Sequence, residues 1–212
     1  MDLDFLDLAR AIPAFVTLLV IMDPLGNVPV FLALTADEDR RARRRTARHA
    51  MFAAGLLIYL FAFFGTQILA ALSIGLPALQ AGGGIVLFLT ALEMLRGDIL
   101  VPDRPRNVNV AIVPLGVPLV AGPGAISAAM VFMAGGNGGG LTLAGQVSVA
   151  IAIAAALMVC WVALHWAGLL ERVLKDNGIH LVTRVMGMLL VAISVELIAT
   201  AIQAYAAGAT AP

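Results

Sequence analysis

Long apolar runs, separated by charge clusters, Gly or Pro, recur along almost the whole chain. A helix that crosses a bilayer needs about 20 consecutive, mostly apolar residues. Hydrophobic residues make up 61% of the 212 positions and charged residues 12%, whereas soluble domains have about 45 to 50% and about 25%. The sequence therefore predicts an all-α polytopic membrane protein with one transmembrane domain over residues 1–212. Six transmembrane helices are expected near residues 8–35, 46–72, 78–96, 109–134, 142–168 and 181–206.

Basic residues are distributed unevenly between the predicted loops. Of the 13 Lys and Arg residues, all but Arg10 lie in or beside the loops after the first, third and fifth helices. Because cytoplasmic loops carry the excess of Lys and Arg, both chain termini are predicted to face the opposite, periplasmic side. The formal net charge of zero argues against a nucleic-acid partner, which calls for a net basic face.

Two sequence features indicate an internal repeat. The third helix contains Gly84 and Glu93 at the same spacing as Gly187 and Glu196 in the sixth. The first and fourth helices share a second feature, because each is interrupted by a cluster of Pro and Gly. Three helices per copy would place the second copy upside down in the membrane, as in many secondary transporters. The predicted architecture is two inverted three-helix repeats, at about 1–103 and 104–212.

The Pro and Gly clusters mark a candidate binding site. Pro and Gly interrupt the helical hydrogen-bond ladder, and irregular backbone at membrane depth normally lines a cavity. Asp23-Pro24 and Gly122-Pro123 are also typical helix starts, an N-cap residue followed by Pro. Two helix N-termini would suit a carboxylate, and the carbonyl groups before the breaks would suit an ammonium, so a zwitterion matches both. The candidate substrate-binding residues are Asp23, Pro24, Gly26, Asn27, Ala121, Gly122, Pro123, Gly124, Ala125 and Ser127.

Three acidic residues are candidates for coupling or gating. Asp23 either only caps the restarted helix or also binds substrate or a coupling cation, H+ or Na+. Glu196 either lies within the membrane as a proton relay or reaches the outer interface. Glu93 is three residues from Arg96, a spacing that favours an interfacial ion pair. No metal site or cofactor is expected, because the three His residues and the single Cys show no metal-ligand spacing.

The runs at 23–35, 83–97 and 114–126 closely resemble the MarC family, also called the neutral amino acid transporter family. This resemblance covers the whole chain. It implies a bacterial inner-membrane protein of six helices, related to LysE-type exporters, and a SnatA-like carrier of glycine, alanine and other small neutral amino acids. The family pattern often has Asp where this chain has Glu93, and Gln where it has Glu196. The Glu at 196 is therefore a candidate for altered substrate preference or proton coupling.

Three function classes compete for such a chain. A secondary transporter, cation- or proton-coupled, is predicted first. A passive channel, or an exporter for another small solute, is the alternative, and a channel would show a continuous polar stripe that this sequence lacks. A membrane enzyme is not expected, because Asp23, Ser127, Glu93 and Glu196 show no catalytic spacing.

Overall fold

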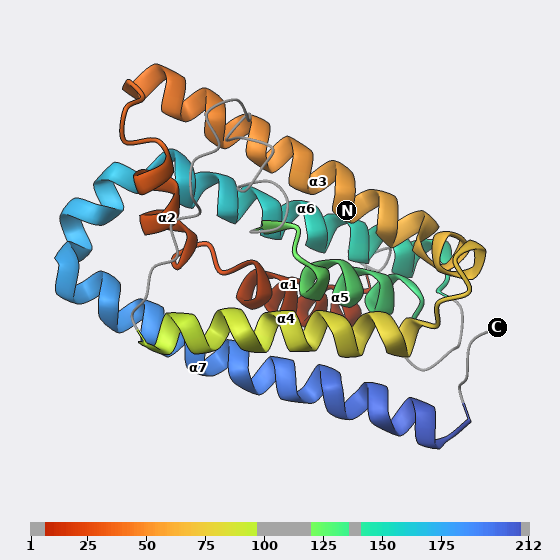
Figure 1. Cartoon of the computed structure of the whole chain (residues 1–212). Coiled ribbons are helices and arrows are strands. Elements are labelled where there is room, and N and C mark those ends of the chain that lie inside the picture. The colour runs from red at the N-terminus through yellow and green to blue at the C-terminus, as the bar shows by residue number, and fades with distance from the viewer. Residues whose placement is uncertain (1–6, 97–119, 136–140, 209–212) are drawn as a thin grey trace.

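The computed structural model describes residues 7–96, 120–135 and 141–208, and the regular secondary structure in these ranges is entirely helical. The helices lie side by side in an elongated bundle (Figure 1). This confirms the predicted all-α class. The helices are α1 (Leu8–Met22), α2 (Asn27–Leu34), α3 (Arg40–Ala71), α4 (Leu76–Arg96), α5 (Pro123–Met133), α6 (Leu143–His165) and α7 (Ala167–Ala206).

Four helices are long and apolar enough to cross a membrane: α3, α4, α6 and the part Gly178–Ala206 of α7. The pair α1 and α2 passes the same test as one span, bent by 46° at the break between them. Only 22% to 44% of the most apolar stretch of the four helices is buried within the chain. Large side chains such as Phe52 and Leu143, each 72% exposed, would be costly in water, so these faces are suited to lipid.

Two helices begin earlier than the sequence predicts. The arginines expected in the first loop instead form the first turns of α3, which is capped by Asp39, whose carboxylate accepts a hydrogen bond from the Ala42 N–H at 2.6 Å. The segment expected as the fifth loop is helical too, since the N–H groups of Leu169 and Leu170 bond to the Trp166 carbonyl. Both segments are rich in helix-forming residues such as Arg, Leu and Ala, and their charges do not prevent a helix outside the apolar span.

The fourth predicted helix, 109–134, is described only in part. Residues 109–119 lie outside the described ranges, and α5 covers 11 residues after the Gly122-Pro123 break. The described residues hold four candidate spans, or up to five when the bent pair counts as one. Six transmembrane helices therefore stay a prediction.

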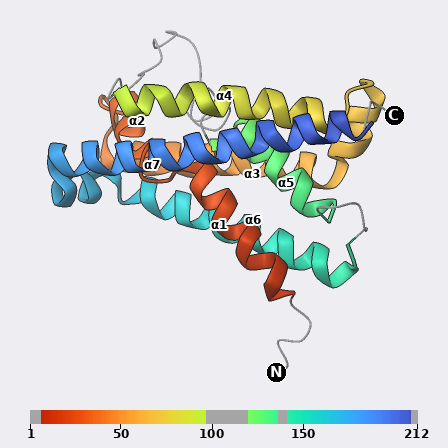
Figure 2. The same ribbon diagram turned by 90° about the horizontal axis from the view of Figure 1, so that it is seen from below.

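Small residues set the distance between α4 and α7, which run antiparallel and lie side by side in both views (Figures 1 and 2). A Cβ atom on Gly84 would lie 3.0 Å from the Ser194 carbonyl oxygen, and one on Gly187 would lie 3.1 Å from the Ala91 carbonyl oxygen. Gly at these two positions therefore allows the two backbones to pack closely.

One end of the bundle gathers the basic residues. Helices α3 and α7 begin, and α4 and α6 end, at this end, on the left in Figure 1. Six arginines lie in the first nine residues of α3, Arg96 ends α4, and Arg172 lies in the second turn of α7. The clustering agrees with the uneven charge distribution noted in the sequence.

Candidate functional site

Asp23 organises the break between α1 and α2. Its backbone adopts the left-handed conformation, with φ 41° and ψ 70°, and its N–H bonds to the carbonyls of Leu19 and Val20. This conformation is uncommon outside Gly, and Asp and Asn are among the residues that adopt it most readily. The carboxylate Oδ1 accepts a hydrogen bond from the Gly26 N–H at 3.0 Å, and the carbonyl oxygen accepts one from the Asn27 N–H at 3.1 Å. Asp23 thus bonds to the chain on both sides of the break.

Helix α2 begins at Asn27, so the prediction that it restarts at Pro24 is wrong. Residues 24–26 form a turn, because Asp23 in the left-handed conformation directs the chain away from the α1 axis. The Asp23 carboxylate accepts a hydrogen bond from Gly26 within this turn, whereas Gly26 itself is the N-cap of α2, which has no side-chain cap bond. The structure therefore corrects both the place where the helix starts and the predicted role of Asp23 as its N-cap.

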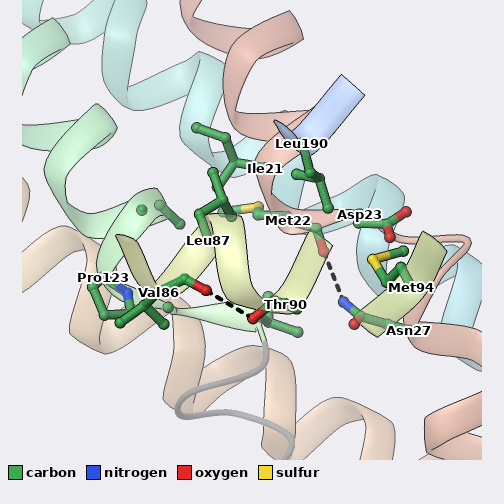
Figure 3. Close-up of a pocket in the computed structure, with 14 residues that line it drawn as sticks. Ile21, Met22, Asp23, Asn27, Val86, Leu87, Thr90, Met94, Pro123 and Leu190 are labelled. Carbon is green, nitrogen blue, oxygen red and sulfur yellow. Dashed lines mark hydrogen bonds between the residues drawn. The ribbon is translucent and has the colours of Figure 1, made fainter. Parts of the chain in front are cut away.

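Asn27 compensates for part of the broken hydrogen-bond ladder. Its side-chain Nδ2 donates to the carbonyl oxygen of Met22 at 2.7 Å (Figure 3). That carbonyl was one of the groups expected to be available to an ammonium, and it already has a partner inside the protein. Asn27 is 7% exposed, so this bond satisfies polar groups that water reaches poorly.

The second break follows the sequence prediction closely. Helix α5 starts at Pro123, and Gly122 is its N-cap in an extended conformation with φ −66° and ψ 165°. Gly has no side-chain acceptor, and no described side chain caps the first turn of α5. The N–H groups at the start of α5 therefore keep their capacity to bind an acceptor, and the helix dipole adds partial positive charge there.

The two breaks meet at a cavity of about 170 Å³ (Figure 3). Residues of both breaks line it, together with one face of α4 and a single residue of α7. Six of the predicted site residues are thereby brought together around one space. The described lining consists of Ile21, Met22, Asp23, Asn27, Val86, Leu87, Thr90, Met94, Val120, Gly122, Pro123, Gly124, Ala125 and Leu190.

Four predicted site residues lie beside the cavity without lining it. Ser127 is fully buried, and its hydroxyl donates to the Gly124 carbonyl at 3.0 Å. Ala121, Pro24 and Gly26 are buried as well. These four residues are buried in or next to the two breaks and do not reach the cavity. The Ser127 hydroxyl is already bonded to its own helix.

Neither of the other two acidic candidates lines the cavity. Glu196 is exposed on α7, and Glu93 is partly exposed on α4. The expected ion pair between Glu93 and Arg96 does not form, since the one ion pair among the described residues joins Arg10 and Asp7. Asp23 is therefore the acidic residue that the described structure brings to the cavity.

Sequence reasoning missed the contribution of α4 and α7. Leu87, Thr90 and Met94 of α4 and Leu190 of α7 face the cavity (Figure 3). The run of three glycines at 82–84 held a signal for it, because a Cβ atom on Gly83 would lie 3.0 Å from the Pro123 carbonyl oxygen. This close contact brings the backbone of α4 directly against the start of α5.

The lining is mostly apolar and carries few polar groups, which is typical of sites for small molecules. The Asp23 carboxylate is 5% exposed and no described basic side chain lines the same space. The described site can therefore offer one negative side chain, one amide, the Thr90 hydroxyl and a helix N-terminus in a mostly apolar surrounding.

The apolar spans and the bent first span define a multi-pass integral membrane protein. The chain belongs to the MarC family, because the family described as "MarC family integral membrane protein" matches residues 8–206.

Three similar proteins are called UPF0056 membrane proteins. That of Aquifex aeolicus is 34% identical over 88% of this chain and 89% of its own. YhcE of Escherichia coli is 31% identical over 94% of both chains, and BU267 of Buchnera aphidicola is 29% identical over 96% and 97%. No solved structure matches the chain.

Proposed function

We propose that this protein is a secondary transporter of small neutral amino acids such as glycine and alanine. The observation that carries the proposal is the single cavity formed where the two helix breaks meet, with Asp23 and Asn27 from one break and Gly122 to Ala125 from the other. Matched breaks in two broken helices are where secondary transporters bind substrates. The zwitterion would bind between the two breaks, near the middle of the membrane.

Opposite ends of a zwitterion have complementary groups here. The uncapped start of α5 suits the substrate carboxylate, because free N–H groups and the helix dipole favour an anion. The Asp23 carboxylate suits the ammonium group or a coupling cation, H+ or Na+. Since the Met22 carbonyl is already bonded to Asn27, the side chain of Asp23 takes the role that the sequence assigned to backbone carbonyls.

The remaining lining favours a small, uncharged side chain. Leu87, Met94 and Leu190 surround the space with apolar atoms, and a charged side chain buried among them would lack a partner. A cavity of about 170 Å³ has room for a small amino acid. The apolar lining supports neutral substrates, and the volume accommodates those of glycine and alanine size.

The contacts between α4 and α7 support an inverted-repeat architecture. Gly84 packs on Ser194, and Gly187 packs on Ala91. The same sequence offset relates Gly84 to Gly187 and Ala91 to Ser194. Each contact is therefore the counterpart of the other when one copy of the repeat is replaced by the second. Leu87 and Leu190, which both line the cavity, are related by that offset too. We therefore keep six helices in two inverted repeats, with both termini periplasmic in a bacterial inner membrane, as part of the proposal.

Counterflow in proteoliposomes tests the proposed activity. Vesicles that hold the purified protein are loaded with unlabelled alanine and diluted into labelled alanine, with and without proton or sodium gradients. A carrier gives transient accumulation of label by exchange, whereas a passive channel lets the label equilibrate without accumulation. Alanine and glycine are expected to exchange, and lysine and glutamate are not.

The variant Asp23→Asn examines the site in the same vesicles. Asn can still accept the Gly26 hydrogen bond and adopt the left-handed conformation, so the substitution removes mainly the charge. Exchange is expected to fall by about tenfold or more, because hydrogen bonds to charged groups contribute about 1.5 to 3 kcal/mol. Asp39→Asn is the matched control, since it removes a carboxylate at the N-cap of α3 and Asn caps helices equally well. Equal exchange in wild type and Asp23→Asn would contradict the proposed role of Asp23.

A further inference from the structure

A second cavity, of about 340 Å³, lies at the basic end of the bundle, between the start of α3 and the junction of α6 with α7. It shares no described lining residue with the cavity at the helix breaks. We call it the arginine pocket. It is lined by Arg40, Arg43, Arg44, Leu164, His165, Trp166, Gly168, Leu169 and Arg172.

The four guanidinium groups of the arginine pocket have no carboxylate partner among the described residues, where the one ion pair is Arg10 with Asp7. Two carboxylates at the start of α3 are used elsewhere. Glu38 accepts the hydroxyl hydrogen bond of Thr46, and Asp39 caps the Ala42 N–H. The pocket therefore concentrates positive charge that the described side chains do not neutralise.

Two nitrogen atoms of pocket residues are buried and have no hydrogen-bond partner among the residues that the structure describes. They are Nε of Arg43 and Nδ1 of His165. Arg43 Nη2 does donate to the Thr35 carbonyl at 3.1 Å, so its side chain is held in place while Nε stays unsatisfied. Buried polar atoms without partners are rare and costly. The Arg43 Nε–H is always a donor, and together with the charge that the described carboxylates do not pair, it indicates an anionic acceptor in this pocket.

The rim of the pocket is apolar and faces outward. Trp166 and Leu169 are each 52% exposed. Trp side chains gather at the level of the lipid headgroups, and the arginine-rich start of α3 lies just outside the apolar part of its span. An exposed Trp beside clustered arginines is typical of the level of the lipid headgroups.

We propose that the arginine pocket binds the phosphate group of an anionic phospholipid. Arg is suited to phosphate because its planar guanidinium donates two parallel hydrogen bonds to the oxygen atoms. Basic pockets between transmembrane helices recognise lipid headgroups in this way. The acyl chains would lie along Leu169 and Trp166, which a free phosphate ion would not use. This inference does not depend on what the protein transports.

Fluorescence quenching by brominated lipids provides the test, because the chain has two Trp residues and one of them lines the pocket. The variant Trp161→Phe leaves Trp166 as the only Trp. This variant of the full chain is reconstituted in phosphatidylcholine vesicles that contain brominated phosphatidylglycerol or, in parallel, brominated phosphatidylcholine. Phosphatidylglycerol is expected to quench Trp166 at a lower mole fraction than phosphatidylcholine does.

Two double variants in the Trp161→Phe background separate the pocket from general surface charge. Arg40→Gln with Arg44→Gln removes two pocket arginines, and Arg41→Gln with Arg45→Gln removes two exposed arginines of the same helix that do not line the pocket. The first pair is expected to weaken the phosphatidylglycerol preference by roughly tenfold, because it removes direct hydrogen bonds to the phosphate. The second pair is expected to weaken it by a smaller factor, because it removes only surface charge. Equal losses in the two pairs, or no preference in the parent, would overturn the proposal.

Inorganic phosphate distinguishes the two sources of the same chemical group. If the lipid is the ligand, phosphate added at millimolar concentration should compete only weakly, because it lacks the acyl chains. Full displacement of phosphatidylglycerol by millimolar phosphate would show a site for the free ion and overturn the lipid assignment. Circular dichroism of each variant checks that the helices are intact.

Discussion

Gly26 lies directly against the carboxylate of Asp23. Its N–H donates to Oδ1 at 3.0 Å, and a Cβ atom at position 26 would overlap Oδ2 of Asp23 and approach Met94 Cε at 2.7 Å. The turn between α1 and α2 thus positions the Asp23 carboxylate through the N–H of Gly26, and a side chain at position 26 would collide with that carboxylate. This relationship connects the Pro and Gly motif of the sequence to the geometry of the site.

Gly26→Ala is therefore expected to displace the Asp23 carboxylate. The substitution should lower the free energy of unfolding by about 1 to 3 kcal/mol, as overpacking does in well-packed cores. It should also reduce alanine exchange in proteoliposomes. Gly82→Ala is the matched control, because no described atom lies within 4 Å of a Cβ atom there. Thermal unfolding in detergent and exchange by the two variants check this, and equal behaviour of both would contradict it.

Asn27→Ala should destabilise the first break. The substitution removes the hydrogen bond to the Met22 carbonyl and leaves a buried acceptor unsatisfied, which costs about 1 to 3 kcal/mol. Asn27→Asp should not restore stability, because an ionised carboxylate cannot donate to that carbonyl. The midpoint of thermal unfolding in detergent measures both variants. A midpoint of Asn27→Ala equal to that of wild type would show that the bond contributes little.

Close packing of α4 on α7 predicts the effect of larger side chains at its two glycines. Gly84→Val and Gly187→Val each place side-chain atoms against a backbone carbonyl of the other helix, so each should lower the unfolding midpoint by a similar amount. Gly82→Val provides the comparison within α4, since no described atom lies within 4 Å of a Cβ atom there. If only one of the two interface variants is destabilised, the reciprocal contact does not hold the helices as described.

Reporter fusions test the number of spans and their orientation. With six helices, alkaline phosphatase fused after residue 212 should be active in the periplasm, and a green fluorescent protein fused there should be dark. A fusion after Arg96, at the basic end, should give the reverse result. Reporters on both termini distinguish six spans from five, because an odd number would place the two termini on opposite sides.

The apolar part of several spans and the places of both breaks could be read from the sequence, whereas the starts of α3 and α7 could not. Hydropathy predicts α4 and α6 to within three residues, because apolar length is what lipid selects. Gly122-Pro123 starts α5 as predicted, since Gly and Pro act through the local backbone. These features depend on a few neighbouring residues, which is why a single sequence reveals them.

Features that depend on packing between helices could not be predicted in the same way. The start of α2 at Asn27 follows from the left-handed conformation of Asp23, which a cap motif alone does not specify. The lining by Met94 and Leu190 follows from how α4 and α7 approach the breaks. The position of Glu196 on an exposed face of α7 likewise depends on the rotation of that helix against α4.

The most direct test of the central claim is equilibrium binding of labelled alanine to the purified protein in detergent. Wild type and Asp39→Asn are expected to bind alanine saturably, with competition by glycine and none by lysine, and Asp23→Asn is expected to bind at least about tenfold more weakly. Saturable binding by Asp23→Asn with the affinity of wild type would show that the cavity between the two breaks is not the amino-acid site. A folded wild-type protein that binds neither alanine nor glycine would contradict the proposed substrate class.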